Sequence, residues 1–104
     1  MIRKAFKMKL YPDKIDTYKS RHNPIWKDLK AILKSHGVHN YSIFFDSETS
    51  YTFGYVEIES EDLWNKIAST DICKKWWKNM AELMETNADY SPVSMELEEV
   101  FHLD

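Results

Sequence analysis

Hydrophobic and polar residues alternate in several stretches of the chain, and each such stretch predicts a β-strand. Residues 2–10 place apolar side chains on one side and basic side chains on the other, which is the period-two pattern of a strand with one buried face. Residues 38–46 and 51–58 are rich in β-branched and aromatic residues and flank a polar turn at 47–50, so they predict a hairpin. Residues 95–103 alternate again and predict a final strand.

Between the first two strands the apolar spacing changes to that of helices. Residues 13–22 predict a first helix, and Pro24 should break or bend it because a proline disfavours the helical conformation of the preceding Asn23. Residues 25–36 carry apolar side chains at core spacing and predict a second helical stretch. Gly37 then closes this stretch as a C-cap.

A second helical region follows the hairpin. Ser60 can N-cap a helix over 61–67, whose first two acidic residues suit the positive end of a helix. Residues 71–84 predict a longer helix and residues 86–93 a polar loop. The order is β-α-β-β-α-β, with a break allowed in each helical part. This is the ferredoxin-like split βαβ pattern, an α+β fold with an antiparallel sheet and helices on one face.

The second face of this sheet is not polar enough to face water. Phe44 lies on the opposite side of its strand from Tyr41, Ile43 and Phe45, and residues 51–58 likewise put aromatic side chains on one side and aliphatic ones on the other. A sheet covered by helices on one face should be polar on its second face. We therefore expect a homodimer that packs sheet against sheet, an assembly of the dimeric α/β-barrel type.

The composition fits a single compact domain over residues 1–104. Aromatic residues make up 14% of the chain, so some rings should line a pocket or an interface. The net charge is −3 and the lysines have the spacing of solvated helix faces, so we expect no nucleic-acid partner. The single Cys73 cannot form an intramolecular disulfide, and no membrane-length apolar run or signal peptide is recognisable. We expect a cytoplasmic protein without a membrane partner.

One helix face carries the first candidate chemistry, because Tyr18 and His22 lie four residues apart. The helix C-terminus favours the charged form of His22, whereas burial among aromatic rings favours the neutral form. A titration near neutral pH, suited to acid–base catalysis, is therefore one interpretation, and a helix-capping histidine bonded to the backbone is the other. For Tyr18 the alternatives are a hydrogen bond to a substrate hydroxyl, or a core position with the hydroxyl at the surface.

Three more aromatic residues complete the candidate set. Tyr41 falls on a strand, where ordinary sheet packing is the simpler interpretation. Trp76 shares the helical spacing of Ile72 and Met80 and is expected in the core, whereas Trp77 lies one step, roughly 100°, further round the helix. An indole at the edge of an apolar stripe indicates a pocket or a partner chain. Stacking on the C–H face of a sugar is one such use.

Motifs for several other chemistries are missing. The sequence has no glycine-rich phosphate loop, no nucleophile elbow and no paired-cysteine zinc pattern. His36 and His39 fall on a helix end and on a strand, so we expect no metal site. Cys73 is expected to be a small buried residue.

Ordered sequence blocks along the whole chain match the pattern of one known family. They are Met1-Ile-Arg-Lys-Ala-Phe6, Arg21-His-Asn-Pro-Ile-Trp26, Leu33-Lys-Ser-His-Gly37, His39-Asn-Tyr41, Val56-Glu-Ile-Glu-Ser60, Ala68-Ser-Thr-Asp71, Trp76-Trp77, Asn87-Ala-Asp89, Ser91-Pro-Val-Ser94 and Glu99-Val-Phe101. In these blocks the chain resembles the L-rhamnose mutarotase family. The resemblance implies a cytoplasmic, ferredoxin-like homodimer that interconverts the α and β anomers of L-rhamnose. It also implies that His22 is the proton donor and that Tyr18, Tyr41, Trp76 and Trp77 contact the sugar.

Such a reaction needs no cofactor. We expect the imidazolium of His22 to protonate the ring oxygen, while a tyrosine hydroxyl or a water takes the anomeric proton and the ring opens and recloses. Trp76 and Trp77 would give the sugar methyl group an apolar wall, and such a wall discriminates weakly, so related sugars are expected to react. The alternatives are a small dimeric ferredoxin-like protein that binds an apolar ligand or haem, and a protein-interaction module.

Overall fold

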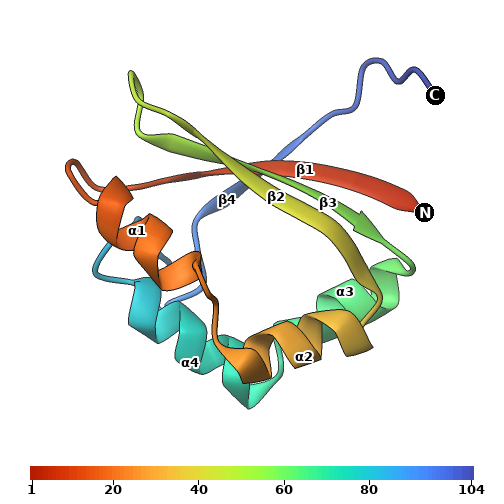
Figure 1. Ribbon diagram of the computed structural model, residues 1–104, viewed down its shortest axis with the longest axis horizontal. Coiled ribbons are helices and arrows are strands. Elements are labelled where there is room, and N and C mark those ends of the chain that lie inside the picture. The colour runs from red at the N-terminus through yellow and green to blue at the C-terminus, as the bar shows by residue number, and fades with distance from the viewer.

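A four-stranded antiparallel sheet forms one layer of the molecule, and four helices form the other (Figure 1). The computed structural model describes all residues, 1–104. The sheet has the strand order β2-β3-β1-β4, which is the predicted ferredoxin-like α+β arrangement. The elements in chain order are β1 (Ile2–Lys9), α1 (Ile15–His22), α2 (Lys27–Ser35), β2 (Val38–Asp46), β3 (Tyr51–Ile58), α3 (Glu61–Ile67), α4 (Asp71–Met80) and β4 (Ser94–Leu97).

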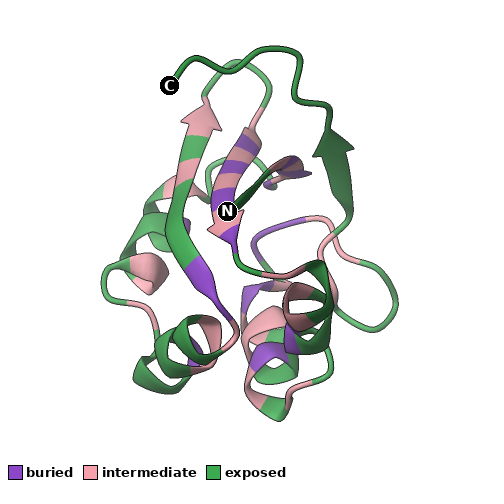
Figure 2. Cartoon of the chain, turned by 90° about the vertical axis from the view of Figure 1, so that its right-hand side faces the viewer, coloured by how far each residue is buried: buried purple, intermediate pink, exposed green.

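Only the helix-covered face of the sheet is buried. Along β3 the residues alternate strictly between buried and half-buried, with Val56 and Ile58 fully enclosed on the helix side. Figure 2 shows this banding on β3 and the uniform exposure of the edge strand β4. The predicted split between the two faces is therefore confirmed. No helix has the length and apolar character needed to cross a bilayer.

Local signals explain where the helices stop and start. The predicted break at Pro24 is confirmed, since α1 ends at His22 and α2 begins at Lys27 beyond a cis Asn23–Pro24 bond. The backbone of Gly37 is left-handed, with φ of +75°, just after α2, as expected at a helix end. Ser60 caps α3 by accepting a hydrogen bond from the Leu63 amide at 3.2 Å.

Two predicted elements are too long. The final strand was expected over 95–103 but spans only Ser94–Leu97, and the residues after it leave the sheet at its edge (Figure 1). An alternating pattern shows which side chains are apolar. A β-strand also needs a neighbouring strand close enough to form backbone hydrogen bonds. The helix expected over 71–84 ends at Met80.

After Met80 the chain turns back towards the sheet. The amide of Tyr11 donates to the carbonyl of Leu83 at 2.9 Å, and Met84 forms an isolated bridge with Leu10. Leu83 and Met84 are buried in the core through this turn rather than through a helical stripe. Both arrangements bury the same apolar residues, so their spacing did not distinguish them.

Candidate functional site

The gap between the sheet and the helices holds a cavity with a volume of about 1300 Å³. Its walls are mostly apolar and come from β1, β2, β3 and all four helices. All five residues singled out from the sequence line it: Tyr18, His22, Tyr41, Trp76 and Trp77. The fold therefore brings these five residues, which are spread between positions 18 and 77 of the sequence, together around one cavity.

The imidazole of His22 is held in one tautomer by its own helix. Its Nδ1 lies 2.8 Å from the backbone carbonyl oxygen of Tyr18. A carbonyl can only accept a hydrogen bond, so Nδ1 carries a proton and Nε2 is the atom that gains and loses one. The interpretation as a histidine bonded to the backbone at the helix end is confirmed. This bond leaves Nε2 free, so the acid–base interpretation stays a prediction.

Burial is the main influence on the charge of His22. It lowers the pKa of the imidazole below its ordinary value, and the hydrogen bond to the Tyr18 carbonyl opposes this only in part. The neutral form therefore predominates at neutral pH. When His22 does take up a proton, the resulting imidazolium is a stronger acid than one in water.

A series of rings fixes the position of this imidazole. The rings of Tyr18 and His22 have centroids 4.3 Å apart, and His22 meets Trp76 edge-on at 5.2 Å. Trp26 in turn packs edge-on against Trp76, at 5.1 Å. Such edge-to-face pairs are the preferred aromatic geometry.

Arg21 fastens α1, which carries the histidine, to the end of α4. Its guanidinium donates to the backbone carbonyl of Asn79 and forms an ion pair with Glu82. The same contact lowers the pKa of the Glu82 carboxyl. Because α4 also carries Trp76, this link holds His22 and Trp76 in fixed relation.

Both tyrosines of the site keep their protons. Burial raises the pKa of Tyr18 to about 12, with a smaller opposing effect from a hydrogen bond with Thr52. Tyr18 is a core residue at 5% exposure, so the alternative with its hydroxyl at the protein surface is wrong. Tyr41 exposes 36% of its surface, yet its hydroxyl is enclosed, and burial raises its pKa well above the usual range.

An irregularity in β2 directs Tyr41 towards the helices. The register of β2 against β3 shifts between His39 and Ser42. The Tyr41 ring lies 6.1 Å from that of Phe6 and 6.2 Å from that of Trp64. Ordinary sheet packing, the simpler interpretation, therefore understates this residue, which forms part of the cavity wall.

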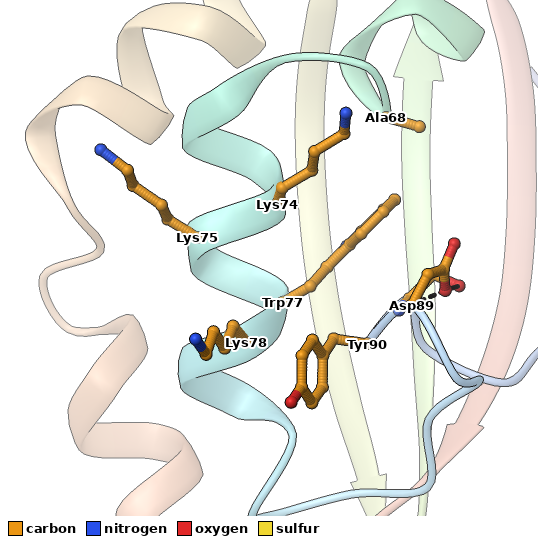
Figure 3. Close-up of a pocket in the computed structure, with 8 residues that line it drawn as sticks. Ala68, Lys74, Lys75, Trp77, Lys78, Asp89 and Tyr90 are labelled. Atoms are coloured by element: carbon orange, nitrogen blue, oxygen red, sulfur yellow. Dashed lines mark hydrogen bonds between the residues drawn. The ribbon is translucent and has the colours of Figure 1, made fainter.

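Trp77 belongs to two hollows at once. Besides the main cavity, it lines a neighbouring hollow of about 740 Å³ between α4 and the loop at residues 89–91. Figure 3 shows the indole reaching from α4 towards Ala68, whereas Lys75 and Lys78 point away from it. The edge position predicted for Trp77 is thus a place at the rim of the cavity.

Sequence reasoning missed part of the cavity wall. Phe6 and Trp64 line the cavity and Trp26 packs against Trp76, but their apolar spacing marked them only as core. Nothing in the sequence distinguished core rings that fill space from core rings that enclose it. Taken together, the cavity offers one imidazole, three phenols and several indoles, and no group of three metal-ligating side chains occurs in the protein.

This arrangement can hold a ring-shaped polar molecule with apolar faces and exchange protons with it. A family model described as L-rhamnose mutarotase matches residues 3–103. An L-rhamnose mutarotase of Shigella flexneri is 58% identical over 103 residues, which is 99% of each chain.

Solved structures agree with that match. The crystal structure of an L-rhamnose mutarotase from Formosa agariphila superposes with a TM-score of 0.93 at 44% identity, covering 100% of both chains. A dimeric ferredoxin-like protein from an uncultured marine organism shares only the fold, with a TM-score of 0.67 and 11% identity over 98% of this chain and 96% of that one. Family model, relatives and cavity point the same way, away from an apolar-ligand or pure interaction role: the chain belongs to the L-rhamnose mutarotase family.

Proposed function

We propose that the protein interconverts the α and β anomers of L-rhamnose by acid–base catalysis at Nε2 of His22. The observation that carries this proposal is the one imidazole of the cavity, held by the Tyr18 carbonyl and set 5.2 Å, ring to ring, from Trp76. Ring opening needs a proton on the ring oxygen and the loss of the proton on the anomeric oxygen. No cofactor enters this scheme.

His22 can serve both halves of the cycle. In its imidazolium form, Nε2 donates a proton to the ring oxygen while the bond from C1 to that oxygen breaks and C1 becomes an aldehyde. After rotation about C1–C2, the ring oxygen attacks the other face of the aldehyde and returns its proton to Nε2, while the former aldehyde oxygen takes a proton back from water. The imidazole ends as it began, as reversible catalysis requires.

The anomeric proton goes to water in this proposal. Both phenols are poor bases or acids near neutral pH, because burial raises the pKa values of Tyr18 and Tyr41. They are suited to bind sugar hydroxyls through hydrogen bonds instead. Trp76 and Trp77 supply the apolar surface for the ring C–H groups and the methyl group.

Anomer exchange of L-rhamnose, followed by saturation-transfer NMR, tests the role of His22. We expect the His22→Ala variant to lose about a hundredfold or more of the exchange rate, the usual contribution of a positioned acid–base group. His36→Ala is the matched control, since His36 also ends a helix with Nδ1 2.8 Å from a carbonyl four residues back, that of Ile32, but lies outside the cavity. Full exchange in a folded His22→Ala protein would contradict the proposal.

We also propose that the protein is a cytoplasmic homodimer built on the open face of the sheet. On this face Phe44 is 67% exposed. Phe53 and Met95 lie in the same row across the strands as Phe44, and Leu97 lies in the next row. An apolar sheet face of this kind favours a partner. We expect light scattering to give a dimer for the wild type and a monomer for Phe53→Glu, with Lys75→Glu on the outer side of α4 as the control that stays dimeric.

A further inference from the structure

Tyr90 has a backbone conformation that its side chain does not favour. Its φ is +70°, in the left-handed region. Asp13, Asn40 and Ser50 also have positive φ, but short polar side chains of this kind are commoner there. A bulky aromatic residue with positive φ is a genuine outlier, and such strain is often kept where a ligand binds.

The loop around Tyr90 imposes this conformation through bonds that do not use the Tyr90 ring. The amide of Asn87 donates to the Ser91 carbonyl at 2.8 Å, and the Asn87 side chain donates to the Ser91 hydroxyl at 3.0 Å. The Ser91 amide donates to the Asp89 carboxylate at 3.0 Å. Glycine or asparagine at position 90 would fit this turn with less strain.

The fold makes little use of the ring itself. Tyr90 remains 45% exposed, so burial in the core does not compensate for the strained backbone. The residue lines both the main cavity and the neighbouring hollow, and Trp77 is the other aromatic residue common to both. In Figure 3 the Tyr90 ring projects from the loop towards α4, and the Trp77 indole extends away from it towards Ala68.

We propose that Tyr90 contacts the substrate: at the rim of the cavity, which it lines together with Trp77, its ring packs against the apolar side of the sugar ring. This inference rests on the proposed sugar site and adds a binding residue to it. Tyr90 carries no proton in the reaction, so its effect falls on binding rather than on the rate of the bound sugar.

Replacing Tyr90 by asparagine separates binding from folding, because the two effects run in opposite directions. Asparagine relieves the left-handed strain, so the melting temperature of Tyr90→Asn should rise. Loss of the ring should raise KM for anomer exchange about tenfold, the lower end of what one apolar pocket contact provides, and leave kcat unchanged. Tyr90→Phe keeps the ring and should retain the wild-type KM.

Ser50→Asn is the matched control, since Ser50 has φ of +64° in the β2–β3 turn and lines neither hollow. It should leave KM unchanged. The proposal is overturned if Tyr90→Asn keeps the wild-type KM, whether its melting temperature rises or falls. A wild-type protein without any exchange of L-rhamnose anomers would instead overturn the proposed function, so the two failures are distinguishable.

Discussion

The two faces of the sheet carry similar rings in different surroundings. On the covered face, Phe6 and Tyr41 line the cavity between the sheet and the helices. On the open face, Tyr51 lies beneath the ammonium groups of Lys7 and Lys9, at 4.7 and 5.6 Å from its ring centroid. Tyr55 on the same face donates a hydrogen bond to Glu57.

The surroundings, rather than the residue types, decide what these rings do. Burial raises the pKa of Tyr18 to about 12 on the covered face. On the open face the pKa of Tyr55 is raised chiefly by its hydrogen bond to Glu57. Within one protomer, burial is therefore the main influence on the phenol of Tyr18, whereas a neighbouring carboxylate is the main influence on that of Tyr55.

The largest predicted effect is on the pH dependence of anomer exchange, because His22 lies in the cavity on the helix side of the sheet. If imidazolium is the donor, the exchange rate should fall about tenfold for each pH unit above the lowered pKa of His22. Exchange measured by NMR between pH 5 and 8 checks this, and a rate that rises with pH would assign His22 to the role of base.

The same shift predicts how folding depends on pH. Because burial holds the pKa of folded His22 below the unfolded value, the unfolded chain binds more protons between these two values. The contribution of His22 to the free energy of unfolding is thus complete above the unfolded pKa and declines as pH falls towards the folded one. In urea titrations, the free energies of unfolding of wild type and His22→Gln should change with pH by different amounts in this window and in parallel outside it.

The second prediction removes one phenol hydroxyl on each side of the sheet: that of Tyr18 on the helix side and that of Tyr55 on the open face. If Tyr18 binds a sugar hydroxyl as proposed, Tyr18→Phe deletes that hydrogen bond and should slow anomer exchange about tenfold. Tyr55→Phe deletes the hydroxyl that binds Glu57 on the open face and should leave exchange unchanged. Equal losses in the two variants would show that the faces are not functionally distinct.

The smallest predicted effect is on packing. A Cβ at Gly54 would lie 2.6 Å from Cε2 and 2.7 Å from Cζ of Phe6 on the covered face. The outer atoms of the Phe6 ring can shift, so Gly54→Ala should lower the free energy of unfolding by about 1 kcal/mol, the low end for overpacking. Ala5→Ser adds one atom to the open face and should cost less, as urea denaturation would measure. A Gly54→Ala protein as stable as wild type would mean that the covered face is loosely packed.

Most of the fold followed from local patterns, and the errors share one cause. The alternation of apolar residues predicted β1, β2 and β3 to within about one residue at each end. The strand expected over 95–103 failed because its second half has no neighbour in the sheet, and Phe101 is left 78% exposed. The candidate residues were identified by residue type, spacing and family resemblance, yet none of these placed Trp26 against Trp76 or Tyr90 in the same hollow as Trp77.

By itself, the sequence determined the order of the elements and the apolar side of each strand, because these depend on the periodicity of neighbouring residues. It also located His22 one helical turn after Tyr18. Tertiary structure decided the rest: that a cavity stays open between the layers, which of the histidine nitrogens is available, and that burial outweighs the backbone hydrogen bond in lowering the pKa of His22. The physical reason is that solvation and hydrogen-bond partners depend on groups distant in the chain, and no local pattern of residues encodes them.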